Sequence, residues 1–571
     1  MEFIVNFLQN SVAYIVPMIV LLGLLIFVHE LGHFLVAKYY KVRVEVFSLG
    51  FGPKLFKFKR GDTVYAISAI PLGGYVKMFG DDPTADVASE HRAYSFTHKP
   101  VGQRIAVVLA GPLMNLFFAI VLFTGVAAIG EQALAPKLGD LEPTSAAYSA
   151  GLRADDTVVS VANEPVKTWD EMQKAIEKNA DRSVSLVVDR GGKQETLQVT
   201  PKLAANKNVL SWDRQVGEVD GLNYSSRASI VGVATPDALA AKDGLKTGDI
   251  IKSVNGTEVT KWREFVDQLA KNASASTINL EVQRGVLDDN NTEMKLTDAK
   301  VTLNVPATAK NQSGEEIAKS LGIEFPELYL RTVVKDSPAE AAGLKKGDRI
   351  VSINGQGMSS FEQVSNMIRA AGQTQGEAKD AKASPLNVVV MREGKEVATT
   401  VAPNAQQRMN NNGREERRFE IGISPLLVEA PPQTIQLASS NPIEALQRGV
   451  SQTVKWTNLT VLSFVRLFQN EVSPKNIGGF LSIGQMAKKS WQIGPSQFLN
   501  VMAIISINLF ILNLLPVPVL DGGHLVFYTI EALRGAPLSM RKMEIAQQVG
   551  LVLLLGLMVF ALFNDFSRIL N

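Results

Sequence analysis

Charge in this 571-residue chain is nearly balanced, with 58 Lys and Arg against 56 Asp and Glu, which excludes a general electrostatic attraction to nucleic acid. Cysteine is absent, which excludes disulfides and thiolate metal ligands and leaves His, Asp and Glu to hold any metal ion. The mean hydropathy of +0.08 is high for a chain with 20% charged residues, so the apolar residues must be concentrated in a few segments. The length of the chain suggests about three or four domains.

Four apolar stretches approach the ~20 residues that a helix needs to cross ~30 Å of hydrocarbon. They cover residues 11–28, 105–130, 498–520 and about 545–563. The segment before the first stretch carries Glu2 and no basic residue, and no small-residue cleavage site follows it, so we expect a retained helix rather than a cleaved signal. The sequence therefore predicts four transmembrane helices.

The first apolar stretch runs into the motif HELGH, which carries His29, Glu30 and His33. Residues four apart share one face of a helix, so both imidazoles can point at one metal ion. Glu30 lies about 100° further round the helix, where it can reach water beside the metal without being a ligand. The alternative is a pair of histidines satisfied within the protein core. Because ionisable groups in a spanning helix are costly and usually functional, the pattern favours the metal site.

The segment after this motif, residues 38–104, holds 11 Lys and Arg against six acids, and basic residues also precede the last apolar stretch. By the positive-inside rule these segments are cytoplasmic, whereas residues 131–440 and both chain ends face outward. Within the basic segment, YAISAIPLGGYVKM alternates apolar residues and breaks at Pro71 and at Gly73-Gly74, which predicts a hairpin near the metal site.

The large outward segment contains three similar stretches, spaced 93 and 99 residues apart, which begin at Gly151, Gly244 and Gly343. Each has a Gly-Leu turn, an alternating apolar strand, a tight turn, and then an aromatic residue that opens a helix-like segment. The pattern resembles PDZ domains of bacterial proteases, which bind extended peptides or chain ends at a sheet edge. The alternative is three spacers that form a steric fence without a ligand.

In the third copy, LGIEF stands where PDZ domains have their carboxylate-binding loop, so Leu321, Gly322 and Ile323 are candidate peptide-binding residues. The first copy departs from the repeat, because Asp155 replaces a turn glycine and Ala162 begins the turn that is Asn-Gly elsewhere. This copy therefore lacks part of the peptide-binding pattern.

Residues 441–469 carry apolar residues at helical spacing, with Arg448, Lys455 and Arg466 interleaved. This pattern suits an amphipathic helix on the outer membrane surface. It also suits a packed helix that links the repeats to the membrane core, and both arrangements allow the helix to act as a gate.

A catalytic zinc ion needs three protein ligands and an open position, so one ligand must come from elsewhere in the chain. Asp521 ends the third apolar stretch, after Pro516 and Pro518. The prolines end the helix, and irregular backbone that lines a cavity can then present a carboxylate oxygen. His524 is the alternative third ligand, and it is otherwise a neighbour of the site or a loop residue.

HELGH in a first span, combined with N-x-x-P-x-P-x-x-D-G at residues 513–522, resembles the site-2 proteases. The stretches VRVEVFSLGFGPKLF, IPLGGYVKMFG, VGQRIAVVLAGPLMN and ALFNDFSRIL are similar to the bacterial subgroup that regulates sigma-E signalling. The resemblance covers residues 1–130 and about 436–571. The middle is similar in type, although the subgroup leads us to expect two PDZ domains where the sequence shows three.

The resemblance implies a multi-pass α-helical membrane protein with inserted periplasmic α+β PDZ-like domains. It implies that His29, His33 and Asp521 hold Zn²⁺ and that Glu30 is the general base. Gly111 and Asn115 match the family's G-x-x-x-N element, which is equally consistent with close helix packing. The expected parts are a membrane core at 1–130, PDZ-like domains at 131–205, 206–320 and 321–435, amphipathic surface helices at 436–495, and a second membrane core at 496–571.

The resemblance also implies residues that bind the substrate backbone. Asn508 and Asn513 would hold it near the zinc, and the alternative for both is hydrogen bonding between helices. The hairpin residues Gly73, Gly74 and Tyr75 would pair with the unwound substrate as an added strand, and the alternative is a plain cytoplasmic hairpin.

The function that follows is an intramembrane zinc endopeptidase of the bacterial inner membrane, with its active site towards the cytoplasm. Its partners would be the bilayer and single-span membrane proteins, namely an anti-sigma factor first trimmed by an outer-side site-1 protease, and leftover signal peptides. The PDZ-like domains would filter these substrates, and no nucleic acid is involved. Two alternatives are a scaffold with a structural zinc site, against which Glu30 argues, and a metal transporter using His29 and Asp521.

Overall fold

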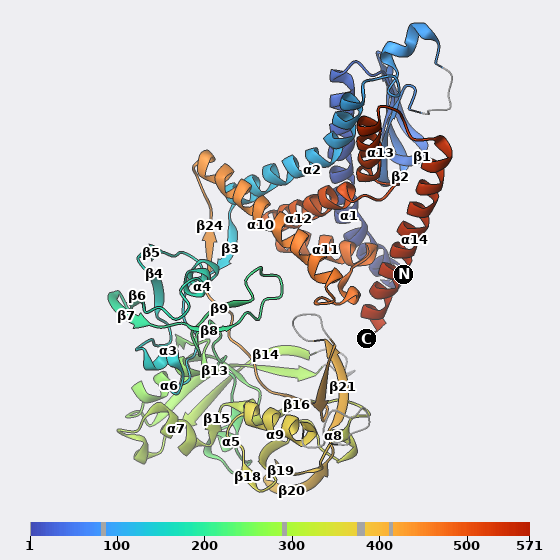
Figure 1. Ribbon diagram of the computed structural model, residues 1–571. Coiled ribbons are helices and arrows are strands. Elements are labelled where there is room, and N and C mark those ends of the chain that lie inside the picture. The colour runs from blue at the N-terminus through green and yellow to red at the C-terminus, as the bar shows by residue number, and fades with distance from the viewer. Residues whose placement is uncertain (1, 82–86, 288–293, 374–382, 410–414, 571) are drawn as a thin grey trace. The chain divides into compact units, whose positions relative to one another are not determined.

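The computed structural model describes residues 2–81, 87–287, 294–373, 383–409 and 415–570. The chain forms two compact units (Figure 1). The membrane unit comprises Met1–Ala133, Asn206–Arg214 and Gln436–Asn571. The repeat unit comprises Leu134–Ala205 and Gln215–Ile435.

The membrane unit is mainly helical. Its helices are α1 (Glu2–Tyr39), α2 (Val101–Ile129), α10 (Pro442–Phe468), α11 (Phe480–Ile493), α12 (Pro495–Leu514), α13 (Asp521–Arg534) and α14 (Met540–Leu570), with short 3₁₀ turns at Ser89–Tyr94 and Pro474–Asn476. Among the described residues, four spans are long and apolar enough to cross a membrane: Ala13–Tyr39, Val101–Ile129, Pro495–Leu514 and Met540–Arg568. The four predicted apolar stretches are therefore confirmed as helices.

The third span ends earlier than its apolar stretch, because α12 stops at Leu514 instead of continuing to residue 520. Pro516 and Pro518 lack the N–H that a continued helix would need. The chain runs irregularly from 515 to 520, and α13 then begins at Asp521. The prediction that the prolines end the helix is confirmed, but Asp521 opens a new helix and does not lie in the irregular segment.

The core of the membrane unit lies where α1, α2 and α12 meet, around buried side chains such as Leu21, Leu25, Phe123 and Met502. Helix α10 packs on α2 so closely that a Cβ at Gly449 would lie 2.9 Å from the carbonyl oxygen of Ile120. This contact supports the packed alternative for the predicted amphipathic helix. Most apolar side chains of α14 are exposed, as expected for a lipid-facing helix.

The basic segment between α1 and α2 forms the predicted hairpin. Strands β1 (Val44–Arg60) and β2 (Thr63–Met78) pair antiparallel and meet at a tight turn, where Arg60 is opposite Thr63. The pairing contains several register shifts, and Gly74 lies opposite Leu49. The hairpin places the second half of β2 beside α1.

The repeat unit contains three copies of one arrangement, in which a four-stranded antiparallel sheet packs against a helix. The first copy has the order β5-β4-β6-β7, formed by β4 (Thr157–Val161), β5 (Glu164–Pro165), β6 (Val184–Arg190) and β7 (Lys193–Val199). The second has β12-β11-β13-β14, formed by β11 (Ile250–Val254), β12 (Thr257–Glu258), β13 (Thr277–Leu287) and β14 (Met294–Asn304). The third has β18-β17-β19-β20, formed by β17 (Arg349–Ile353), β18 (Gln356–Gly357), β19 (Leu386–Arg392) and β20 (Lys395–Val401).

Further helices and strand pairs lie within the copies and at their ends. The helices are α3 (Ala146–Ser149), α4 (Trp169–Glu177), α5 (Leu239–Lys242), α6 (Trp262–Lys271), α7 (Gly314–Leu321), α8 (Pro338–Ala341) and α9 (Phe361–Gln373), with 3₁₀ turns at Ala307–Ala309 and Pro326–Leu328. The pairs are β3 (Glu131–Leu134) with β24 (Thr434–Leu437), β8 (Lys202–Ala205) with β9 (Gln215–Glu218), β10 (Gly232–Val233) with β15 (Ile323–Glu324), β16 (Leu330–Val333) with β23 (Ile423–Pro425), and β21 (Asn404–Met409) with β22 (Glu415–Glu420).

A buried Asp–Arg pair recurs in every copy. The pairs are Asp156–Arg190, Asp249–Arg284 and Asp348–Arg392, with nitrogen–oxygen distances of 2.6 to 2.7 Å. In each pair the same arginine also donates to the carbonyl of the glycine that begins the repeat stretch. The pair thus joins the strand end to the preceding turn, and its repetition shows that the three sequence stretches fold alike.

The first copy keeps the turn backbone of the others despite its different residues. Asp155 adopts a positive φ of 68°, close to the 93° of Gly248 in the second copy. Ala162 has φ 50°, matching the 48° of Asn255. An Asp tolerates this left-handed region better than most residues, whereas for Ala it is strained.

The repeat boundaries differ from those predicted at 205/206 and 320/321. Val219 is buried in the core of the first copy, and Leu321 and Ile323 are buried in the core of the second. Ile421 occupies the corresponding place in the third copy. The first and second copies therefore take core residues from beyond their predicted boundaries, and the LGI loop belongs to the second copy rather than the third.

Candidate metal centre

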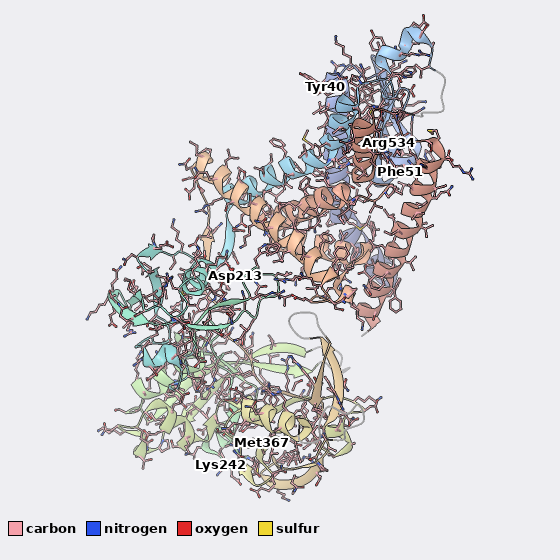
Figure 2. All side chains as sticks on the ribbon, viewed as in Figure 1. Tyr40, Phe51, Asp213, Lys242, Met367 and Arg534 are labelled. Atoms are coloured by element: carbon pink, nitrogen blue, oxygen red, sulfur yellow. The ribbon has the colours of Figure 1, made fainter. Side chains whose placement is uncertain are left out.

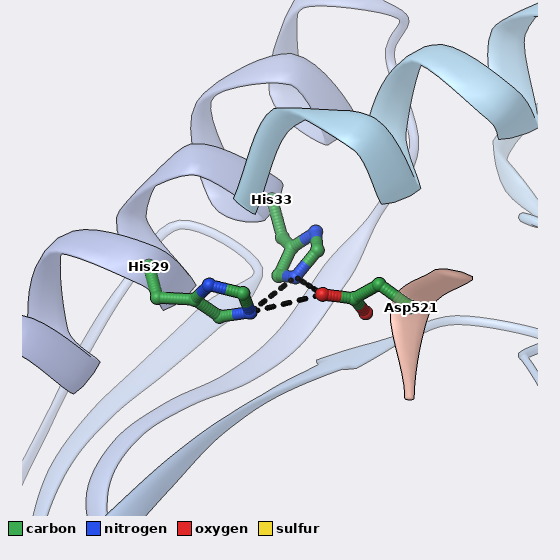
Figure 3. Close-up of side chains that lie close together, drawn as sticks. All are labelled: His29, His33 and Asp521. Atoms are coloured by element: carbon green, nitrogen blue, oxygen red, sulfur yellow. Dashed lines mark hydrogen bonds and ion pairs between the residues drawn. The ribbon is translucent and has the colours of Figure 1, made fainter. Parts of the chain in front are cut away.

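Helix α1 presents two imidazoles on one face because His29 and His33 are one turn apart (Figure 3). Their Nε2 atoms are 3.2 Å apart. Asp521 joins them from α13, with its Oδ2 3.1 Å from Nε2 of His29 and 3.6 Å from Nε2 of His33. The two histidines therefore converge on one point with Asp521, which is far from them in the sequence.

The position of Asp521 depends on close packing at the start of α13. A Cβ at Gly522 would lie 2.2 Å from the carbonyl oxygen of Leu515, and a Cβ at Gly523 would lie 2.4 Å from Cα of Pro518. Any larger residue would push α13 away from the irregular segment. Burial raises the pKa of the Asp521 carboxyl, but the two imidazoles beside it outweigh that effect, so the pKa falls below its usual range and the group is a carboxylate.

The spacing of the three ligand atoms fits a zinc ion. In a tetrahedral site with metal–ligand distances near 2.05 Å, ligand atoms are about 3.3 Å apart. The three distances here, 3.1, 3.2 and 3.6 Å, lie around that value. Two imidazole nitrogens and one carboxylate oxygen are a usual catalytic donor set that leaves the fourth position for water. The residues present therefore fit the metal that the motif predicts.

Helix α2 shapes the site from the other side. Nδ1 of His33 lies 2.9 Å from the main-chain oxygen of Val107, an acceptor that keeps the proton on Nδ1 and leaves Nε2 free for metal. A Cβ at Gly111 would lie 2.3 Å from His33 Nε2, so this glycine gives the ring its space. One turn further, the side chain of Asn115 lies 3.2 Å from His29 Nδ1. The sequence matched Gly111 and Asn115 to a family element without predicting that they contact the two histidines.

Glu30 lies beside the hairpin. A Cβ at Gly74 would lie 3.2 Å from Cγ of Glu30, so β2 passes directly beside this carboxylate. Gly73, with φ 154°, leaves room for the ring of Phe51, which stacks on Tyr75 at 6.2 Å between ring centres (Figure 2 labels Phe51). The predicted hairpin residues therefore lie next to the predicted base.

The two predicted asparagines occupy different places. Nδ2 of Asn513 is 3.5 Å from His29 Nδ1, at the limit of a hydrogen bond and within the metal centre. Asn508 instead accepts a hydrogen bond of 3.0 Å from the hydroxyl of Thr460 on α10, which is the helix–helix alternative. His524 packs against the ring of Tyr528, and in the described part of the chain the cluster of ligand atoms does not include it.

Comparison with known proteins supports the same chemistry. Residues 17–557 match the family described as "Peptidase family M50". The chain belongs to peptidase family M50. It is 30% identical to the regulator of sigma-E protease of Salmonella typhimurium over 99% of this chain and 100% of the relative. It is 28% identical to the Escherichia coli protein of that name, again over 99% and 100%.

A putative zinc metalloprotease of Neisseria meningitidis is 29% identical, over 99% of this chain and 100% of the relative. Among solved structures, a PDZ domain protein from Parabacteroides distasonis matches 51% of this chain and 95% of its own, at 12% identity and a TM-score of 0.14. The family shows that the chain is a zinc metalloendopeptidase, and its spans and relatives make it an inner-membrane protein.

Proposed function

We propose that the chain cuts peptide bonds inside transmembrane helices of other proteins. The observation that carries this proposal is the placement of the ligand cluster: His29 and His33 lie within one apolar span, and Asp521 follows another span after the short segment 515–520. Ligands built into spanning helices bring hydrolysis to the depth of a substrate helix. By the positive-inside rule the basic hairpin marks the cytoplasmic side, so the site opens towards the cytoplasm and the repeats are periplasmic.

The chemistry divides between the metal and the chain. Bound zinc acidifies water and polarises the scissile carbonyl. Glu30 accepts the proton of the attacking water and then donates it to the leaving amine nitrogen. The carboxylate of Asp521 and the two imidazoles hold the metal, with Nδ1 of His33 anchored on the Val107 carbonyl.

The hairpin solves a problem of substrate access. A helix hides its peptide bonds in internal hydrogen bonds, so the substrate must unwind before attack. We propose that Gly73, Gly74 and Tyr75 offer an edge that replaces those bonds, supported by the contact of Gly74 with Glu30. Asn513, close to His29, would hold the substrate backbone, and Asn508 would join it once released from Thr460.

The names of the relatives suggest the substrate class. Proteins called regulators of sigma-E protease point to a single-span anti-sigma factor as substrate, cut after an outer-side protease has trimmed it. Leftover signal peptides would be a second substrate class, because they also consist of a single membrane-spanning segment. The three repeats would then exclude substrates that retain a bulky outer domain, and the loop at Leu321, Gly322 and Ile323 would bind peptide as part of the second copy.

The test is cleavage of a tagged single-span protein in membranes by wild type and by Glu30→Gln, with zinc content measured on both. We expect Glu30→Gln to lose at least about 100-fold in cleavage while retaining zinc, because a general base is lost and no ligand is removed. The control is Glu45→Gln, an exposed hairpin glutamate that pairs with Lys77. Unchanged cleavage by Glu30→Gln would refute the mechanism. Zinc transport without cleavage by wild type would favour a transporter.

A further inference from the structure

The side chain of Asn115 is fully buried between helices, yet it is incompletely bonded. Its nitrogen Nδ2 lies 3.2 Å from Nδ1 of His29. Its oxygen Oδ1 has no hydrogen-bond partner in the part of the chain that the structure describes. Buried acceptors without a donor are rare in native proteins and call for a functional explanation.

Metal binding decides which nitrogen of His29 carries the proton. Nε2 faces Asp521 and His33, so it must be unprotonated to coordinate a metal. The proton of the neutral ring then sits on Nδ1, which becomes a donor and needs an acceptor. An amide nitrogen cannot accept, so the present orientation of Asn115 does not suit the metal-binding tautomer.

Rotating the Asn115 amide by half a turn gives His29 the acceptor that its metal-binding tautomer needs. The oxygen and nitrogen of an amide have nearly the same shape, so the exchange costs little space. It brings Oδ1 to the place where Nδ2 lies, within hydrogen-bond distance of His29 Nδ1. His33 already has this arrangement, because its Nδ1 lies 2.9 Å from the Val107 carbonyl oxygen.

We propose that Asn115 is a positioning residue for the metal centre, whose side-chain oxygen accepts the Nδ1–H of His29 and holds its Nε2 ready for zinc. This inference rests on the proposed zinc site. Together with the Val107 carbonyl it would give each histidine ligand its own acceptor on α2. The second amide near His29 is that of Asn513, but its nitrogen is more distant, at 3.5 Å.

The test measures zinc affinity of the purified full-length chain by competition with a chelating dye, and the absorption spectrum of Co²⁺ bound in place of zinc. Asn115→Leu keeps the size of the side chain without an acceptor, and Asn115→Asp keeps an acceptor. The matched control is Ser506→Ala. The Ser506 hydroxyl donates to the main-chain oxygen of Asn115 at 2.8 Å and is equally buried, so its loss perturbs the same helix contact without touching His29.

We expect Asn115→Leu to weaken zinc binding about 10- to 100-fold and to change the Co²⁺ spectrum. Asn115→Asp should bind zinc within about threefold of wild type or more tightly, since a carboxylate is a common partner of metal-bound histidine. Ser506→Ala should be unchanged. If Asn115→Leu does not fold, Asn115→Ala, which lacks the acceptor and adds no bulk, takes its place.

Wild-type affinity in Asn115→Leu would overturn the proposal, and so would equal losses in the Leu and Asp variants, which would show a packing role. A loss in Asn513→Leu but not in Asn115→Leu would transfer the role to Asn513. These outcomes leave the proposed function intact, because wild type still binds zinc. A wild type that binds zinc with the expected Asn115 effect but cleaves no membrane substrate would overturn the proposed function alone. A wild type without zinc would overturn both.

Discussion

At the residue scale, the metal centre depends on a glycine that leaves room for a ligand as well as on the ligands themselves. Gly111 faces the His33 ring so closely that a Cβ would lie 2.3 Å from Nε2, the atom that must reach the metal. The role of Gly111 is therefore to leave room for the His33 ring in its metal-binding position.

We therefore predict that Gly111→Ala loses zinc affinity by at least about tenfold, because His33 must turn away from the cluster. Chelator competition on the purified chain measures this. Gly102→Ala is the matched control on the same helix, since a Cβ there meets nothing within 4 Å. Equal zinc affinities in the two variants would contradict the prediction, because they would show that His33 can still bind zinc beside an alanine at position 111.

At the element scale, α13 must be held in place for Asp521 to meet the histidines of α1. Arg104 of α2 makes two hydrogen bonds to the Glu531 carboxylate near the other end of α13, at 2.5 and 3.1 Å. The guanidinium also lies over the ring of Tyr528, 4.9 Å from its centre. The side chains of Arg104 and Glu531 are only 11% and 17% exposed, so the pair is poorly screened by water.

We expect Glu531→Gln to destabilise the docking of α13 by about 3 kcal/mol, because it leaves a buried guanidinium without its counter-charge. Hydrogen exchange of α13 amides should then be roughly 100-fold faster, with zinc affinity reduced. The control is Glu45→Gln, which breaks an exposed pair with Lys77 and should change exchange little. Unchanged exchange in Glu531→Gln would mean that packing alone holds α13.

At the scale of the whole molecule, the first and second repeats are joined by a cluster of charges. Asp155 bonds Lys261 at 2.7 Å and Arg263 at 2.6 Å, both at the start of α6. Burial raises the pKa of Asp155, but the hydrogen bond from Lys261 and the charge of Arg263 outweigh it and lower the pKa to about 2. The residue that breaks the repeat pattern therefore ties the first copy to the second.

This lowered pKa predicts a pH dependence of the contact between these repeats. Since the carboxyl binds its proton less readily in the folded state, its stabilisation is complete above the ordinary pKa near 3.8 and is lost as pH falls towards 2. Asp155 is 39% exposed, so solvent screening limits the effect to about 1 kcal/mol. Urea unfolding of the full chain at pH 7 and pH 3, followed by tryptophan fluorescence, should show a smaller pH effect in Asp155→Asn. Asp170→Asn, at an exposed i,i+4 pair with Lys174, is the control.

The parts of this protein that the sequence by itself determined are those set by local periodicity. Helical spacing places His29 and His33 on one face, apolar length defines the four spans, and prolines end α12 where the sequence says they should. The three repeats were visible for the same reason, because each turn and strand pattern is local.

Tertiary structure alone decided how distant segments meet. It brought Asp521 to the histidines, put Asn115 against His29, and assigned Leu321 to the second repeat instead of the third. Each of these three contacts depends on which buried surfaces pack together. The residue pattern within one segment does not say which distant segment will pack against it. Local pattern was therefore enough to find the two histidines and Glu30, whereas the complete metal centre required the fold, because its third ligand lies far away in the chain.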